Sequence, residues 1–231
     1  MRRLLGLLLV CCAAACAPAP VAVKPVSTSV PGVPGLPDVP VPPVSDAARA
    51  VGFVDVRTIV PDAVVDLRYA TADNFVGEPL YPAGARCLVH ESLADGLTTA
   101  AARLRADGLV LVFWDCYRPH DVQVRMFDVV SNPAWVAKPG PYSKSHESGR
   151  SVDVTTAGRT GLTDMGTGFD DFTPVANAYA TDGVSAAAQQ NRAVLRAAMT
   201  AGGFAPYAGE WWHFDGPGAG ERRPIINVPV T

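Results

Sequence analysis

The chain has 231 residues, a formal net charge of −3 and no run of basic residues. Its length suits one domain with a substantial core and is short for two. The near balance of charge, without basic residues interleaved with aromatic ones, argues against nucleic acid as a partner.

The first 16 residues have the pattern of a signal peptide. Two arginines are followed by an apolar run over residues 4–10 and by small residues as far as Ala15, which is the order found in export signals. The apolar run is too short to cross a bilayer. Cys16 follows three alanines and resembles the cysteine of a bacterial lipobox, without the usual leucine three residues earlier. Ordinary cleavage after an Ala-x-Ala site is the alternative. We expect an exported protein of the periplasm or cell envelope, which contacts the membrane only if Cys16 carries lipid.

Residues 17–45 form a separate compositional region. They contain nine prolines and no aromatic residue, which excludes helices and central strands. We therefore expect a disordered or polyproline-like tether, followed by one folded domain over residues 46–231.

Within the folded domain, hydrophobic patterns predict a mixture of helices and strands. Because the two do not alternate in a regular βαβ order, we expect a single domain of the α+β class. The predicted elements are a strand over 64–69, a helix over 93–104 ended by Gly108, a buried strand over 109–114, a helix over 120–130, a short strand over 151–155, a polar loop over the site at 161–183, a helix over 184–201, and a strand or pair of strands over 204–214.

Two short segments carry the residues of a candidate metal site. They hold His146, Asp153 and His213, and the whole chain has only four histidines. Zinc binds His nitrogen and Asp oxygen, and a catalytic zinc uses three protein ligands and leaves the fourth position to water. Glu210 then remains as a general base.

The sequence around these residues indicates whether they form a metal site together or are unrelated polar side chains. The spacing of His146 and Asp153 does not fit one helical turn, but a loop that leads into a strand can bring them together, with Gly149 providing the turn. Alone, His146 would be interpreted as a surface histidine. Asp153, between two valines in a predicted strand, is disfavoured unless it has a partner. The two tryptophans beside Glu210 form an apolar wall that would raise its pKa toward that of a working base.

Arg118 follows the predicted buried strand directly. A guanidinium at the end of a strand can face an oxyanion or a substrate carboxylate, and an ion pair with a nearby aspartate is the alternative. We expect His90 and His120 to be surface or helix-cap residues.

Cys87 and Cys116 are the two cysteines outside the export segment. In an exported domain they favour a disulfide, and two buried thiols are the alternative.

The combination of His146, Gly149, Asp153 and the segment 210–213 resembles the signature of the VanX-type D-alanyl-D-alanine dipeptidases, within the hedgehog-like group of zinc D-Ala-D-Ala peptidases. The similarity extends from about residue 54 to residue 214. In this family the first histidine often has a serine two residues before it, whereas here that position is Lys144. Further similar stretches are residues 66–75, 117–119 and 164–167.

The resemblance implies a compact α+β domain with a small, mostly antiparallel sheet and flanking helices. It also implies one zinc ion per chain, bound by His146, Asp153 and His213, with Glu210 as the base and Arg118 stabilising the transition state. The expected reaction is hydrolysis of the small dipeptide D-Ala-D-Ala. Two alternatives stay open: a D-Ala carboxypeptidase acting on peptidoglycan stem peptides, and a non-catalytic zinc-binding or cell-wall-binding module.

Overall fold

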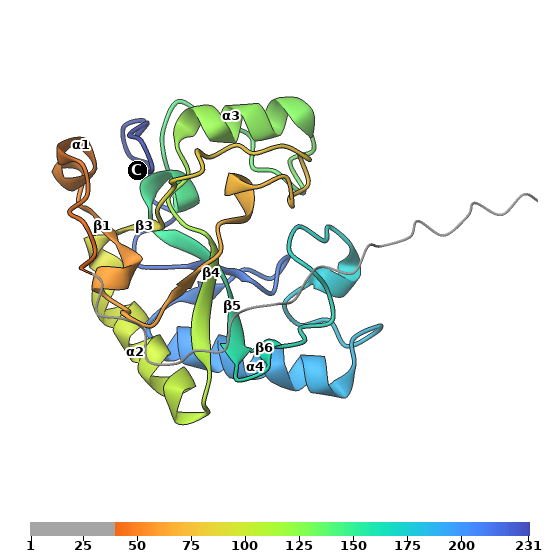
Figure 1. Ribbon diagram of the computed structural model, residues 1–231. Coiled ribbons are helices and arrows are strands. Elements are labelled where there is room, and N and C mark those ends of the chain that lie inside the picture. The colour runs from red at the N-terminus through yellow and green to blue at the C-terminus, as the bar shows by residue number, and fades with distance from the viewer. Residues whose placement is uncertain (1–39) are drawn as a thin grey trace, which may run out of the picture.

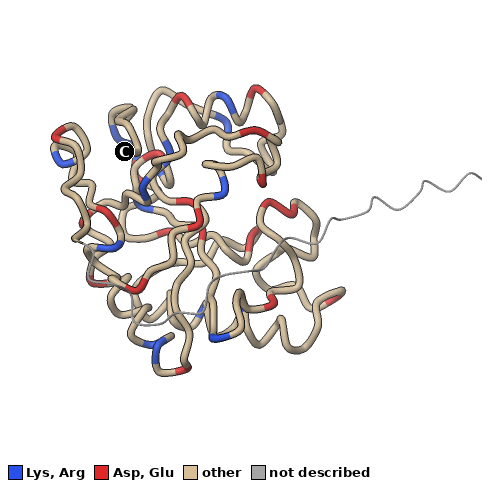
Figure 2. The backbone as a smooth tube through the Cα atoms, in the orientation of Figure 1, with Lys and Arg blue, Asp and Glu red and all other residues tan. Residues whose placement is uncertain are grey.

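The computed structural model describes residues 40–231 (Figure 1). The predicted signal peptide, Cys16 and the tether up to residue 39 lie outside the described residues. Among the helices of the described part, none has the length and apolar character needed to span a bilayer. Acidic and basic residues are interspersed along the described chain (Figure 2).

A six-stranded sheet forms the centre of the domain, in the order β2-β4-β5-β8-β7, with β6 also paired to β5. All its pairs are antiparallel except β2 with β4. A separate antiparallel pair joins β1 to β3. The α+β class and the mostly antiparallel sheet are therefore confirmed. The strands are β1 Phe53–Asp55, β2 Val64–Val65, β3 Leu88–His90, β4 Val110–Asp115, β5 Ser151–Gly158, β6 Gly161–Leu162, β7 Ala205–Pro206 and β8 His213–Asp215.

The helices lie on two sides of the sheet (Figure 1). Helices α2 and α4 pack against each other on one side, where a Cβ on Gly96 would come within 2.3 Å of the Gly202 carbonyl oxygen. Helix α3 lies on the other side, above the ends of β4 and β5. The α-helices are α1 Asp46–Ala50, α2 Ala94–Ala106, α3 His120–Val129 and α4 Ala186–Ala201, and the 3₁₀ turns are η1 Val56–Thr58, η2 Arg68–Ala70, η3 Glu91–Leu93, η4 Ser145–Ser148 and η5 Pro174–Ala176.

Local sequence explains most of these elements. In α2, the residues at helical spacing are the buried ones, Leu97, Ala100, Ala101 and Leu104, and Gly108 follows the helix with a φ of +70°. In α4, the Ser185 side chain accepts a hydrogen bond from the Ala188 backbone N–H and so caps the helix start. The predicted strand over 109–114, the helix over 120–130 and the pair of strands over 204–214 are confirmed as β4, α3 and β7–β8.

The predicted strand over 64–69 is mostly wrong. Only Val64 and Val65 pair with β4, and the chain then turns into η2. The turn lets the Arg68 guanidinium form ion pairs with both Asp66 and Asp73. The predicted loop over 161–183 also contains short elements, β6 and η5.

Candidate active site

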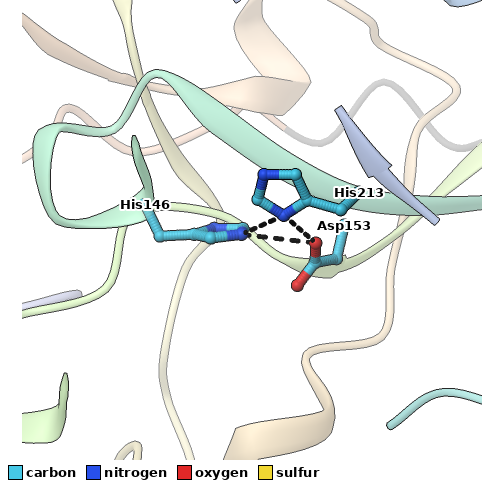
Figure 3. A group of neighbouring side chains, drawn as sticks. All are labelled: His146, Asp153 and His213. Atoms are coloured by element: carbon cyan, nitrogen blue, oxygen red, sulfur yellow. Dashed lines mark hydrogen bonds and ion pairs between the residues drawn. The ribbon is translucent and has the colours of Figure 1, made fainter. Parts of the chain in front are cut away.

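The three predicted metal ligands come from two paired strands and from the 3₁₀ turn before one of them (Figure 3). Asp153 in β5 pairs directly with His213 in β8, and His146 lies in η4, which leads into β5. The Asp153 Oδ1 atom is 3.2 Å from His146 Nε2 and 3.0 Å from His213 Nδ1. The two histidine nitrogens are 3.1 Å apart. Antiparallel pairing therefore joins two segments that are 60 residues apart in sequence.

These donor atoms fit a zinc ion. A tetrahedral zinc with bonds of about 2.0–2.1 Å holds its ligand atoms about 3.3 Å apart, close to the observed separations. The other ring nitrogen of each histidine already has a partner: His146 Nδ1 is 2.8 Å from the Cys116 carbonyl oxygen, and His213 Nε2 is 3.1 Å from Asp215 Oδ1. Such partners fix the tautomer and direct the free nitrogen toward the metal.

The charges of the site also suit a cation. Burial would raise the pKa of Asp153, but His146 and His213 outweigh it and hold that pKa well below its usual range. Burial would lower the pKa of His213, but hydrogen bonds to Asp153 and Asp215 raise it to about 10. A bound metal ion would take the place of this proton.

Two residues with positive φ, Ser145 and Gly149, give η4 its shape. Gly149 ends it with a φ of +65°, and a Cβ at this position would lie 2.6 Å from the Phe53 ring. Glycine is therefore required both for the left-handed backbone and for the close packing. Ser145 also has a positive φ, +50°, and its hydroxyl donates to Ser151 at 2.9 Å.

Glu210 lines the same cavity as the three donor residues, and the cavity has a volume of about 350 Å³. Glu210 does not belong to the metal-binding group. Its burial raises its pKa to about 7, the direction expected from the neighbouring tryptophans. Glu210 lies in the same cavity as the three donor residues, as a base that acts on a metal-bound water must.

Arg118 lines the cavity and is also paired with an aspartate. Its Nε and Nη2 atoms donate to Asp115 Oδ2 at 3.1 and 2.6 Å, and Nη1 donates to Gln123 Oε1 at 2.8 Å. Asp115 also accepts a 2.7 Å hydrogen bond from the Tyr81 hydroxyl. Three of the five guanidinium N–H groups are therefore used. Arg118 therefore does form the local ion pair that was the alternative to a role in catalysis. This ion pair with Asp115 also holds the guanidinium at the cavity wall.

His90 and His120 lie outside the metal-binding group. The His90 side chain accepts from the Ser92 backbone N–H and caps η3, and its Nε2 lies 2.8 Å from an Arg150 nitrogen. His120 begins α3 and pairs with Glu147. His90 is a cap residue, as expected, whereas His120 is a partly buried residue of the first turn of α3 that pairs with Glu147.

Sequence reasoning missed Asp170. This residue lines the cavity from the loop between β6 and α4, accepts a 3.1 Å hydrogen bond from the Tyr69 hydroxyl, and has a φ of +57°. Burial and the nearby Asp153 raise its pKa to about 8. An acid among the aromatic residues of a Gly-rich loop was the available signal. Asp215, whose Oδ1 lies 3.1 Å from His213 Nε2, was also missed, because its role depends on His213 being a ligand.

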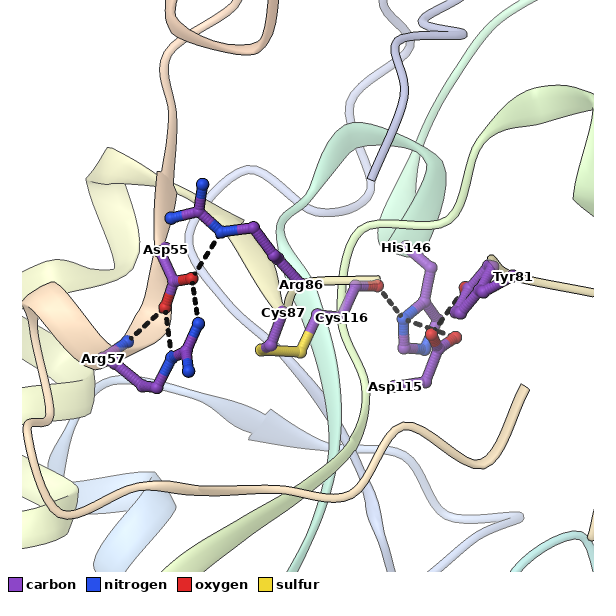
Figure 4. Close-up of a disulfide and its surroundings, with 8 residues drawn as sticks. All are labelled: Asp55, Arg57, Tyr81, Arg86, Cys87, Asp115, Cys116 and His146. Atoms are coloured by element: carbon purple, nitrogen blue, oxygen red, sulfur yellow. Dashed lines mark hydrogen bonds and ion pairs between the residues drawn. A yellow bond between two sulfur atoms is a disulfide. The ribbon is translucent and has the colours of Figure 1, made fainter. Parts of the chain in front are cut away.

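The structure joins Cys87 and Cys116 in a disulfide, with their Cα atoms 5.3 Å apart (Figure 4). Its Cys116 carbonyl oxygen is the partner of His146 Nδ1. The Tyr117 backbone N–H donates to the Leu88 carbonyl oxygen at 2.8 Å, so the bridge reinforces the contact between β3 and the end of β4.

We expect a Cys87→Ser, Cys116→Ser double variant to be less stable and to bind zinc more weakly. A bridge across 29 residues contributes about 3–4 kcal/mol in chain-entropy treatments, or a melting shift on the order of 10 °C. Zinc affinity should fall because the Cys116 carbonyl oxygen, which orients His146, is no longer held in place by the disulfide. Melting curves and competition with a chelator measure the two effects. Unchanged melting and zinc affinity, or two free thiols in the unreduced wild-type protein, would contradict this role.

Comparison with known proteins places the chain in a family. Residues 49–231 match the peptidase M15 family described as D-ala-D-ala dipeptidase. The chain is 38% identical to the D-alanyl-D-alanine dipeptidase of Escherichia coli (strain K12), over 72% of this chain and 85% of that protein. It is 31% identical to the protein of the same name from Enterococcus faecium, over 71% and 91%. The chain therefore belongs to the D-Ala-D-Ala dipeptidase family.

Two further proteins are similar to the chain. The D-alanyl-D-alanine dipeptidase of Streptomyces coelicolor is 34% identical over 70% of this chain and 90% of that protein. Among solved structures, a mutant of the vancomycin resistance D,D-pentapeptidase VanY in complex with Zn(II) aligns with a TM-score of 0.38 and 18% identity, over 57% of this chain and 74% of that one.

Proposed function

We propose that this protein is an exported zinc dipeptidase that hydrolyses D-Ala-D-Ala to two molecules of D-alanine, with one zinc ion per chain. The observation that carries the proposal is the convergence of His146, Asp153 and His213 in a cavity that Glu210 and Arg118 also line. Membership of the D-Ala-D-Ala dipeptidase family supports the choice of substrate.

His146 Nε2, Asp153 Oδ1 and His213 Nδ1 would hold the zinc. When bound, zinc supplies a Lewis acid that acidifies water and polarises the substrate carbonyl. Glu210 accepts a proton from the water whose oxygen attacks the carbonyl carbon, and delivers it to the amine when the C–N bond breaks. Arg118 donates hydrogen bonds to the carbonyl oxygen as that oxygen gains negative charge.

The charges along the cavity suit a small zwitterion. Its lining includes the cationic side chains of Arg118, Lys138 and Lys144 and the carboxyl groups of Asp170 and Glu210. A free dipeptide carries one carboxylate and one ammonium group. The cavity offers cations for the carboxylate, and the carboxyl oxygens of Asp170 can accept hydrogen bonds from the ammonium group. Lys144 occupies the position where the family often has serine, so this chain has a cation there.

An adjoining cavity favours one second candidate, D-Ala carboxypeptidase activity on stem peptides. This cavity has a volume of about 200 Å³ and is lined by Trp135, Phe172, Tyr207 and Glu210, which also line the first cavity. A longer peptide could extend into it from the scissile bond.

The test is a substrate panel offered to the purified zinc-loaded protein, with D-Ala-D-Ala, L-Ala-L-Ala and a muramyl pentapeptide supplied separately. Release of D-alanine from D-Ala-D-Ala alone is the expected result. Release from the pentapeptide alone would replace the proposal with the carboxypeptidase. Zinc binding without hydrolysis of any peptide would instead support a non-catalytic module, for which a fourth protein ligand would be usual.

Arg118 provides a second prediction. Arg118→Ala should reduce turnover of D-Ala-D-Ala by about 10²–10³-fold, the usual effect of losing one oxyanion donor. Because the variant also leaves the buried Asp115 without its cation, Arg118→Lys should be compared as the milder change. Steady-state kinetics and zinc content decide the matter. Near-normal turnover in both folded variants would restrict Arg118 to its ion pair with Asp115.

We also propose that Cys16 is lipidated and that residues 17–45 form a tether between the lipid and the folded domain. The sequence of the first 16 residues supports this proposal. The Cys16→Ala variant should lose the mass of the lipid and leave the membrane fraction for the soluble envelope fraction. An unmodified Cys16, or a mature N-terminus beyond it, would favour ordinary signal cleavage.

A further inference from the structure

The loop between β6 and α4 forms one wall of the cavity, and side chains of α4 hold its backbone. Asp170 and Phe172 of this loop line the cavity. Three α4 side chains donate to carbonyl oxygens of the loop: Asn191 to Asp164 at 2.8 Å, Arg192 to Met165 at 2.7 Å, to Val175 at 2.9 Å and to Asn177 at 3.1 Å, and Arg196 to Ala178 at 3.0 Å.

Arg192 differs from the other two in its burial and its partners. It is 2% exposed, and no carboxylate of the described residues lies within ion-pair distance of it. A buried guanidinium without a counter-ion is unfavourable unless hydrogen bonds compensate. Here Nε and Nη1 donate to three backbone carbonyls on two separate parts of one loop, which a single planar guanidinium can bridge. The Nη2 atom is buried and has no hydrogen-bond partner among the described residues.

Arg192 also reaches the segment that carries Glu210. Its guanidinium carbon lies 5.7 Å from the centre of the Trp211 ring. The Trp211 backbone N–H donates to the Ala176 carbonyl oxygen at 3.0 Å, and the Trp211 indole N–H donates to the Thr167 hydroxyl at 2.8 Å. Arg192 therefore lies where the loop with Asp170 meets the segment with Glu210.

This arrangement gives a role to residues 164–167, which the mechanism does not use. Asp164 and Met165 supply carbonyl oxygens to α4, and Thr167 accepts from Trp211. Gly166 has a φ of +82°, and a Cβ there would lie 3.2–3.3 Å from the side chains of Val184 and Ala188. The stretch is one of two points where the loop is attached to α4, the other being residues 175–178.

We infer that Arg192 is a positioning residue that holds the Asp170 wall and the Glu210 segment of the cavity in a fixed relation for substrate binding. Arg192 acts through backbone carbonyls and the Trp211 ring, without touching the substrate. The part of this inference that concerns substrate binding rests on the proposed D-Ala-D-Ala hydrolysis.

The experiment compares Arg192→Met with Arg196→Met in the zinc-loaded protein. Arg196 is the matched control because it is on the same helix and binds one loop carbonyl. In Arg192→Met, amide hydrogen exchange in residues 164–178 and at Trp211 should be at least about tenfold faster, because several charge-assisted hydrogen bonds are lost. The KM for D-Ala-D-Ala should rise about tenfold by the same reasoning. Zinc affinity should stay within a few-fold of wild type, because the ligands lie on η4, β5 and β8.

The inference and the proposed function can fail independently of each other. Loop exchange and KM in Arg192→Met that match those of Arg196→Met would overturn the inference, and so would faster exchange with an unchanged KM. If Arg192→Met does not fold, Arg192→Lys takes its place, since lysine keeps the charge but cannot bridge three carbonyls. If wild type fails to hydrolyse D-Ala-D-Ala, the proposed function fails, while unchanged loop exchange would overturn the anchoring by Arg192 separately.

Discussion

Glu210→Gln should keep its zinc and its fold while turnover of D-Ala-D-Ala falls by about 10²–10⁴-fold, the usual contribution of a general base. Glutamine has nearly the same size as glutamate but cannot accept a proton. Glu210 lines the cavity without belonging to the metal-binding group. Its loss should therefore abolish proton transfer and leave metal binding intact.

Burial raises the pKa of Glu210. Because only the ionised carboxylate can accept a proton, wild-type turnover should fall as the pH is lowered through that pKa.

The matched control is Glu91→Gln, an exposed glutamate in η3. It changes the same functional group outside the cavity, and its kinetics should equal those of wild type. Zinc content and steady-state kinetics are measured for both variants. Near-normal turnover in zinc-loaded Glu210→Gln would remove Glu210 from the mechanism and leave the metal site without its base.

Alanine at His146, Asp153 or His213 should abolish stable zinc binding, because two remaining protein ligands are too few for a catalytic site. The effect should exceed the roughly 10–100-fold loss of affinity typical of an outer-shell partner. Asp215→Asn, which weakens the hydrogen bond to His213, should show that smaller loss. Comparing the loss of zinc affinity in His213→Ala and Asp215→Asn therefore distinguishes a ligand from the residue that orients it.

His90→Ala is the control for the histidine variants, because His90 lies next to η3 and Arg150 and outside the metal-binding group. It should retain one zinc per chain and normal activity. Equilibrium dialysis followed by elemental analysis gives the stoichiometry for each variant. Full zinc retention in all three ligand variants would show that the metal binds elsewhere.

The parts of the fold that could be predicted from sequence are those where local pattern and tertiary environment agree. Within the apolar run over 109–114, residues 111–114 are buried in β4, and the periodic residues of α2 face the core. The pattern over 64–69 misled because the chain leaves the sheet after Val65 and turns into η2, where Arg68 forms ion pairs with Asp66 and Asp73. Those contacts have no signature in hydrophobic periodicity.

The candidate site divides in the same way. His146, Asp153, Glu210 and His213 could be proposed because two short segments hold them in combination, although His146 alone would be interpreted as a surface histidine. Arg192 could not, because it acts through partners far along the chain, such as Met165 at a sequence separation of 27. Asp170 had a weak signal in the aromatic residues around it, but its contact with Tyr69, 101 residues away, has no signature in the local sequence. Asp215 could not either: its partner is near in sequence, but its importance depends on His213 being a ligand.

A zinc titration of metal-free protein, with D-alanine release from D-Ala-D-Ala as the readout, tests the proposed zinc dipeptidase most directly. Activity should rise from zero in proportion to added zinc and reach a plateau at one equivalent per chain. Activity before zinc is added, a plateau at two equivalents, or no D-alanine at any zinc concentration would contradict it.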